Sequence, residues 1–315
     1  MLDRRILVVT GKGGVGKTTV SVALALRAAA AGLKVMVCET SGADQVPQIF
    51  SVIPRPYEVQ SLAPRLSSLS ITSEAAIEDY IVQQLRFRRI YQMVFRNRIV
   101  GPFMDAVPGL HDLITLGKVW DLERRKSWGR PEWDLLIVDA PATGHGLSLL
   151  GSPRGMMDLT VAGPFYENAK LIADLFDDPA RTGIVLVSLP EEMPVNETLD
   201  LYERLGPMRQ QVLALALNNV YPEPLEDAEL YRRHRPLLAQ GANDAGLQEL
   251  RLMDRALVRA RREHRAKERL QALSVPLVEL PAVWPAHTEH LGRGLRVDDL
   301  PPLVRALGPI CGDPA

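Results

Sequence analysis

Residues 11–19, which read GKGGVGKTT, constrain the fold of this chain more than any other stretch. They fit the phosphate-binding pattern of a glycine, four residues and then Gly-Lys-Thr. An apolar, β-branched run at residues 5–10 precedes them, as expected of a strand buried on both faces of a parallel sheet. Residues 18–31 are rich in Ala and Leu and contain no Gly or Pro, which predicts a helix. The sequence therefore predicts a strand–loop–helix unit that cradles phosphate groups.

Each part of this loop has a chemical role in binding a nucleoside triphosphate. Glycines permit positive φ angles and let backbone N–H groups approach phosphate oxygens, and the following helix directs its positive end at the same oxygens. Lys17 is expected to reach the β- and γ-phosphates, and the Thr18 hydroxyl to ligate Mg²⁺. A glycine-rich loop without a ligand would leave this Lys-Thr pair unexplained. The expected phosphate-binding residues are Gly13, Gly14, Val15, Gly16, Lys17, Thr18 and Thr19.

Composition and charge exclude several classes of protein. The formal net charge is −1 and the pI about 6.6, so nothing predicts attraction to nucleic acid or anionic lipid. Two cysteines, Cys38 and Cys311, are too few for a disulfide framework or a thiolate metal site, which fits a reducing cytoplasm. The apolar stretch at residues 21–38 contains charged residues and a glycine, so it predicts a core helix and a strand, with no membrane insertion.

A single α/β domain spanning residues 1–315 is expected, with a doubly wound, mainly parallel sheet. Further buried strands are predicted at residues 33–39, 133–139, 183–189, 212–218 and 275–280. Helical insertions are expected at about residues 51–130 and 153–180. A long helix at residues 244–272 interleaves arginines with acids, so a solvated face with i,i+4 pairs is favoured over a nucleic-acid patch.

Lys12 directly follows the first glycine of the loop, and an ordinary phosphate loop does not need it. The pattern Gly-Lys-Gly-Gly-x-Gly-Lys-Thr-Thr resembles the deviant Walker A motif of the partition ATPases, septum-site regulators, nitrogenase iron protein, and arsenite and tail-anchored-protein ATPases. The resemblance implies a nucleotide-sandwich dimer in which Lys12 reaches the phosphates bound by the partner subunit, as an arginine finger does. Without the resemblance, Lys12 would be read as a solvated residue at a loop tip.

Asp139 ends the strand at residues 133–139, where an acid can hold Mg²⁺ through a water or a hydroxyl. The continuation DAPATGH, residues 139–145, resembles the Asp-Thr-Ala-Pro-Thr-Gly-His signature of the arsenite and tail-anchored-protein ATPases and differs at its second to fourth positions. Together with the two lysines, it points to this branch of P-loop ATPases, whose cofactors are ATP and Mg²⁺. His145 is expected either to relay the nucleotide state or to be a buried, hydrogen-bonded residue.

The loop after residue 39 departs from the resembled family. That family has an aspartate near the start of this switch loop, which orients the attacking water, and Ser41 occupies the corresponding position here. Either Asp44 or Glu39 substitutes through a different loop path, or hydrolysis is slow. The candidate catalytic residues are therefore Lys12, Lys17, Asp44 and Asp139.

The remaining candidate positions concern the base and a client. The resemblance implies that Asn218, at the carboxyl end of a strand, meets the adenine edge, and that Pro281 and Val283 belong to a loop lining the base. Helices of the two insertions resemble the family's client-binding region. The methionines at residues 156 and 157 suit an adaptable apolar groove, although at helical spacing they are more often core filling.

The preferred function is a dimeric switch ATPase driven by Mg-ATP, as a homodimer or as a heterodimer with a paralogue, which moves a helical region that binds a protein client. One rival is a nucleotide-binding regulatory subunit with little hydrolysis, working with a paralogous partner. Another is a partition-type ATPase that binds DNA nonspecifically, which the balanced charge disfavours. The cysteines that would bind arsenite, or zinc at a dimer interface, are missing, so direct oxyanion efflux is not expected.

Overall fold

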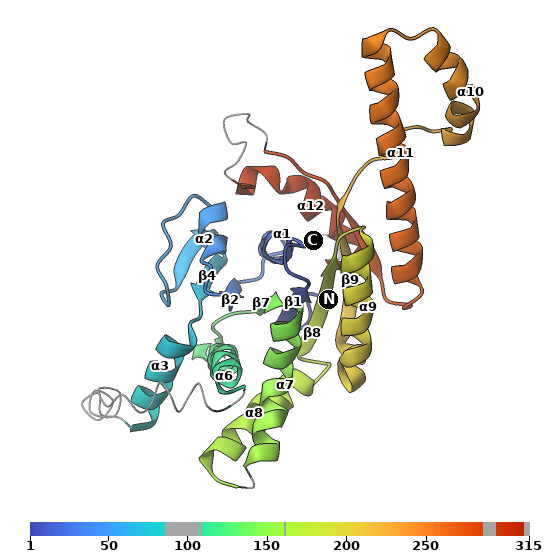
Figure 1. The fold of residues 1–315 in the computed structure, drawn as a ribbon. Helices are drawn as coiled ribbons and strands as arrows, with labels where there is room; N and C mark the ends of the chain where they lie inside the picture. Colours follow the sequence, from blue (N-terminus) through green and yellow to red (C-terminus); the bar gives the residue numbers. More distant parts are fainter. Residues whose placement is uncertain (86–106, 108, 161, 286–293, 312–315) are drawn as a thin grey trace.

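The computed structural model describes residues 1–85, 107, 109–160, 162–285 and 294–311. Its centre is an eight-stranded sheet with the order β10-β9-β8-β1-β7-β2-β4-β3 (Figure 1). Every pair of neighbours is parallel except β3 and β4 at one edge. The strands are β1 (Ile6–Gly11), β2 (Val35–Glu39), β3 (Gln60–Ala63), β4 (Leu66–Ser70), β7 (Leu135–Ala142), β8 (Thr182–Ser188), β9 (Val212–Val220) and β10 (Leu277–Pro281).

Both faces of the sheet are covered by helices, because the central strands are apolar on both sides. In β1, Ile6 and Val8 belong to one buried cluster and Leu7 and Val9 to another. One face is covered by α6 (Leu110–Arg124), α7 (Thr143–Leu159), α8 (Pro164–Asp177) and α9 (Glu192–Arg204). The other is covered by α1 (Lys17–Ala30) and α12 (Pro301–Ala306), with the short helices α2 (Gln45–Ile49) and α13 (Gly308–Cys311) beside α1. The predicted doubly wound α/β fold is confirmed.

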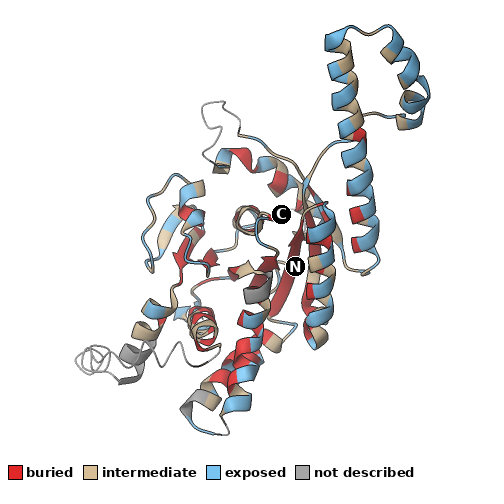
Figure 2. Cartoon of the chain, in the orientation of Figure 1, coloured by how far each residue is buried: buried red, intermediate tan, exposed pale blue. Residues whose placement is uncertain are grey.

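A helical hairpin extends away from the body of the molecule (Figure 1). It consists of α10 (Ala228–Gln240) and α11 (Asp244–Gln271), and α10 has no buried residue (Figure 2). The carboxyl-terminal half of α11 contacts the body and buries Leu257, Ala266 and Leu270. The long charged helix predicted at residues 244–272 is therefore confirmed, and i,i+4 pairs such as Arg259 with Glu263 occur along it.

Residues 60–70 correct the expectation of a helical insertion over residues 51–130. They form β3 and β4, which extend the main sheet, so helix begins only at α3 (Ser73–Leu85). β4 pairs in parallel with β2 over five residues, and this tertiary pairing produces a strand from a serine-rich sequence. A separate two-stranded hairpin, β5 (Lys126–Ser127) and β6 (Arg130–Pro131), follows α6. Residues 86–106 of this expected insertion lie outside the described residues.

The second expected helical segment, residues 153–180, contains the end of α7 and all of α8, which pack against each other and against α6. Met156 is buried in the core and Met157 packs against it, so these methionines fill space between helices. Among the helices of the described residues, none combines the length and apolar character needed to cross a bilayer. Further elements are the 3₁₀ turns η1 (Gly206–Gln211) and η3 (Val297–Asp299).

Candidate active site

The loop between β1 and α1 depends on glycines for its shape. Gly14 and Gly16 have φ angles of +81° and +89°, a region that other residues rarely adopt. A Cβ at Gly16 would also lie 2.3 Å from Asn218 Nδ2, and a Cβ at Gly11 would lie 2.3 Å from the Val187 carbonyl oxygen. The loop is therefore closely packed against the carboxyl ends of β8 and β9.

Asp139 lies directly beside the first turn of α1. Its Oδ2 accepts a hydrogen bond of 2.6 Å from Thr18 Oγ1, and its Oδ1 accepts one of 3.0 Å from Ser21 Oγ. Burial raises the pKa of Asp139, while these two hydrogen bonds and the charge of Lys17 act in the opposite direction. Asp139 and Thr18 together present hard oxygen donors, the ligand type that Mg²⁺ prefers.

Each of the two loop lysines has a partner within the chain. Lys17 Nζ donates to the Lys12 carbonyl oxygen at 3.0 Å, and burial lowers the pKa of Lys17 while Asp139 partly opposes that shift. Lys12 is directed at α9, where its Nζ lies 2.9 Å from Glu197 Oε1 and contacts Met193 Sδ. Lys17, the first residue of α1, thus folds back onto the loop, whereas the Lys12 side chain turns toward α9.

A cavity of about 560 Å³ opens over the loop. It brings together five predicted residues, Gly14, Gly16, Lys17, Thr18 and Thr19, with Asp139 from β7. Thr40 and Ser41 line it from the loop after β2, and Asp112 lines it from α6. Of the other expected loop residues, Val15 is buried and Gly13 is not among the cavity's lining residues. The cavity therefore combines backbone amides, one lysine and two carboxylates.

The two acids proposed for the switch loop, Glu39 and Asp44, are not among the residues that line the cavity. Glu39 is buried, and its two oxygens accept hydrogen bonds from the backbone N–H groups of Gln45 at 2.7 Å and Val46 at 3.2 Å. It therefore caps α2, and burial raises its pKa despite these bonds. Asp44 precedes α2 with a φ of 50° and makes no side-chain capping bond. It is not among the residues that line the cavity.

Two of the expected base-binding residues, Asn218 and Pro281, lie on the neighbouring strands β9 and β10. Asn218 Nδ2 donates to the Val15 carbonyl oxygen at 2.9 Å, so its amide is attached to the phosphate loop. Pro281 of β10 is in register with Val220 of β9. Val283 is partly buried and packs against the apolar cluster on the face of the sheet that α1 covers. The structure brings Asn218 next to the phosphate loop, whereas Pro281 ends the adjacent strand β10 and Val283 follows that strand.

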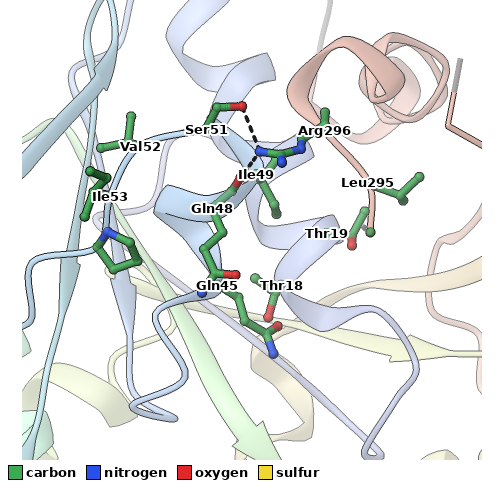
Figure 3. Close-up of a pocket in the computed structure, with 12 residues that line it drawn as sticks. Thr18, Thr19, Gln45, Gln48, Ile49, Ser51, Val52, Ile53, Leu295 and Arg296 are labelled. Atoms are coloured by element: carbon green, nitrogen blue, oxygen red, sulfur yellow. Dashed lines mark hydrogen bonds between the residues drawn. The ribbon is translucent and has the colours of Figure 1, made fainter. Parts of the chain in front are cut away.

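A second cavity of about 590 Å³ lies beside the first and shares Thr18, Thr19 and Gln45 with it (Figure 3). Figure 3 shows Arg296 reaching from the segment before α12 to the end of α2. Its Nη1 donates to the Gln48 carbonyl oxygen at 2.8 Å and to Ser51 Oγ at 2.7 Å. Arg296 thus fixes the end of α2 against the carboxyl-terminal part of the chain.

Sequence reasoning missed two polar residues near the phosphate site. Ser21 lies one helical turn after Thr18, and that spacing was a signal that it shares a face with Thr18. Asp112 is in the first turn of α6, and its Oδ2 accepts a hydrogen bond of 2.7 Å from Ser148 Oγ of α7. No local pattern indicated that α6 would bring an acid to the loop.

Neither of the two cysteines is among the residues that line the phosphate cavity. Cys38 is buried in β2, and burial raises its pKa to about 12. Cys311, at the end of α13, has its pKa raised to about 11 by burial. In the described part of the chain, no group of three or more His, Cys, Asp or Glu residues is placed to hold a metal ion. A metal at this site would therefore be coordinated by Thr18, Asp139 and oxygens of a bound nucleotide.

Comparison with known proteins agrees with the geometry. Residues 4–162 and 155–240 match the family described as anion-transporting ATPase. The chain is 32% identical to the ATPase BagA of Mycobacterium tuberculosis over 307 residues, which cover 89% of this chain and 87% of that protein. It is 28% identical to a putative arsenical pump-driving ATPase of Halobacterium salinarum, over 76% of this chain and 39% of that protein. It is 27% identical to the arsenical pump-driving ATPase of Escherichia coli, with 76% and 44% covered.

Proposed function

Since this chain belongs to the anion-transporting ATPase family and is an ATPase, we propose that it works as a Mg-ATP-dependent dimeric switch. ATP bound between two subunits would close the dimer, and hydrolysis would release it. The supporting observation is the site itself, in which Lys17, Thr18 and Asp139 converge on one cavity at the loop. Thr18 and Asp139 would hold Mg²⁺, which neutralises charge on the phosphates.

Lys12 is the residue that links this site to a second subunit. Its ion pair with Glu197 is partly exposed, with 25% of the lysine side chain and 38% of the glutamate side chain accessible. Exposed pairs of this kind contribute about 0.2–1 kcal/mol, so phosphates of a partner subunit would compete with Glu197 for the lysine. The same argument applies to a second copy of this chain and to a paralogue.

The helices α6, α7 and α8 are the region that closure would move. β7 contains Asp139 and leads directly into α7, so a shift at the phosphate end reaches the packed α7–α8 pair. Leu159 at the end of α7 is 64% exposed and Leu171 on α8 is 47% exposed. Exposed apolar side chains on a movable helical region suit a protein client.

Light scattering of the purified chain tests the dimeric switch. We expect ATP with Mg²⁺, but not ADP, to shift the chain from monomer to dimer, and Lys12→Ala to abolish the shift while leaving ATP binding in place. Glu197→Gln frees Lys12 and should favour the dimer by up to about fivefold, the equivalent of 1 kcal/mol. Glu203→Gln is the matched control, because Glu203 lies on α9 like Glu197 and the substitution removes its ion pair with Arg209. A Lys12→Ala variant that dimerises normally would refute the role of Lys12.

A second measurement examines the client region. Hydrogen–deuterium exchange over residues 143–177 should differ between the ATP and ADP states if closure moves α7 and α8. Equal exchange in the two states would limit the switch to the nucleotide site. A dimer that forms only when a paralogue is added would assign the same mechanism to a heterodimer.

A further inference from the structure

We propose that Asp112, in the first turn of α6, orients the water that attacks the terminal phosphate of ATP. This inference rests on the ATP site proposed above and assigns the one catalytic role that the switch loop leaves open. A group that orients the attacking water must face the phosphates, so the candidates are the side chains that line the phosphate cavity.

The acids near the cavity differ in how far their oxygens are already engaged. Within the described residues, two carboxylates line the cavity, Asp112 and Asp139. Both oxygens of Asp139 accept hydrogen bonds from α1 hydroxyls, which fits the metal site. Both oxygens of Glu39 accept backbone N–H groups of α2, and Asp44 is not among the lining residues. Asp112 is therefore the remaining acid that faces the cavity.

The position of Asp112 is fixed by two neighbouring contacts. Gly109 precedes α6 with a φ of +76°, and its carbonyl oxygen accepts the Leu113 N–H at 2.9 Å, so the first turn of α6 is well formed. Ser148 Oγ donates to Asp112 Oδ2 at 2.7 Å. The described side chains offer no hydrogen bond to the second oxygen, Oδ1, and the side chain is only partly buried. One oxygen is therefore anchored, and the other is available to a water in the cavity.

The reaction needs one hydrogen-bond acceptor for that water. The water oxygen forms a bond to the γ-phosphorus while the bond from this phosphorus to the β,γ-bridging oxygen breaks, which leaves ADP. The attacking water gives up one proton, which Asp112 accepts and returns to the released phosphate. An acid on α6 makes this step depend on α7 as well, because Ser148 belongs to the helix that follows the Asp139 strand.

Hydrolysis and binding are measured separately on the full chain. A single-turnover experiment, with Mg²⁺ present and the protein in excess over ATP, gives the rate constant of hydrolysis. Calorimetry gives the affinity for ATP. We expect Asp112→Asn to lower the rate constant about 100-fold, the lower end for general acid–base catalysis, while affinity changes less than about threefold. Asp112→Glu should recover part of the rate. If Asp112→Asn does not fold, Asp112→Ser takes its place and should show the same loss of about 100-fold.

Ser148→Ala is the matched structural control. It removes the contact between α6 and α7 but leaves the carboxylate, so we expect a fall in rate of less than about fivefold. Loss of rate in Ser148→Ala equal to that in Asp112→Asn would overturn the proposal and leave Asp112 as a brace. An unchanged rate in Asp112→Asn, or a wild-type chain that binds ATP without hydrolysing it, would also overturn it. A wild-type chain that does not bind ATP would instead refute the proposed function.

Discussion

Thr18 Oγ1 donates a hydrogen bond of 2.6 Å to Asp139 Oδ2, which joins the first turn of α1 to the carboxyl end of β7. The two residues are 121 positions apart in the sequence, and parallel pairing of β1 with β7 brings them together. The bond places the two expected metal ligands in contact. It also connects the proposed metal site directly to α7, which continues from β7.

Removal of the Thr18 hydroxyl should uncouple ATP binding from Mg²⁺. In Thr18→Val we expect ATP affinity with Mg²⁺ to fall about tenfold, about 1.4 kcal/mol, and affinity with a chelator present to stay the same. Ser21→Ala is the control, because Ser21 also bonds Asp139 but is fully buried and not among the residues that line the cavity. Titrations with Mg²⁺ and with EDTA measure both variants. An equal loss in the two media would show that Thr18 is not a metal ligand.

Acid should weaken Mg-ATP binding before it unfolds the protein. Burial raises the pKa of Asp139 above that of an ordinary aspartate, so acidification neutralises this carboxylate earlier than exposed ones. The folded state therefore holds this proton more tightly than the unfolded chain. As pH falls through the raised pKa, this group loses its metal affinity while its contribution to stability improves.

Calorimetry at a series of pH values measures this effect. The affinity of the wild-type chain should decline on the acid side before the melting temperature begins to fall, whereas Asp139→Asn should bind weakly at every pH in the series. An affinity for Mg-ATP that declined only as the protein unfolded would contradict the assignment of Asp139 as a metal ligand.

The two positive-φ glycines of the loop should respond differently to alanine. Gly14→Ala meets open space and carries only the cost of a left-handed backbone, about 1–2 kcal/mol. Gly16→Ala carries the same cost and also collides with Asn218, so it should be more destabilising. Chemical denaturation compares the two. The double variant Gly16→Ala with Asn218→Ala should return to the level of Gly14→Ala combined with Asn218→Ala. No difference between the single variants would show that the contact is unimportant.

Glu39 should stabilise the switch loop through the backbone of α2. Glu39→Ala leaves the N–H groups of Gln45 and Val46 without their acceptor, and we expect a loss of about 2 kcal/mol, because a buried unsatisfied donor costs about 1–3 kcal/mol. Asp44→Ala is the matched control, since Asp44 makes no capping bond and should change stability by less than about 0.5 kcal/mol. Urea denaturation measures the free energy of unfolding of both variants. Equal losses of stability in the two variants would show that Glu39 is no more important than Asp44 for capping α2.

The parts of the fold that the sequence predicted well are those with strong local patterns. Residues 11–19 combine a glycine loop with a flanking strand and helix, and the structure contains that unit as β1 and α1. The buried strands β2, β7, β8, β9 and β10 are apolar over most of their length and were all expected. Because β1 is apolar on both faces, Ile6 packs into one buried cluster and Leu7 into the other.

The parts that were missed depend on contacts between distant segments. β3 and β4 lack the continuous apolar run of the central strands; β4 takes its strand conformation from parallel pairing with β2, and β3 from antiparallel pairing with β4. Asp112 lies 36 positions from Ser148 in the sequence, and no local motif marks their hydrogen bond. Glu39 resembles a free switch acid in the sequence, whereas folding turns it into the cap of α2. Lys12 was expected to face a partner subunit, and within one chain it contacts α9.

Calorimetric titration of Mg-ATP into the wild-type chain and into Lys17→Ala tests the central claim most directly. Lys17 begins α1 directly after the loop and lines the cavity, and a charge-assisted contact with phosphate would be lost in the variant. We expect the wild-type chain to bind Mg-ATP and Lys17→Ala to bind about 100-fold more weakly, about 2.7 kcal/mol, while circular dichroism shows the same fold. No binding by the wild-type chain, or equal binding by the variant, would contradict the assignment of the β1–α1 loop as the ATP site.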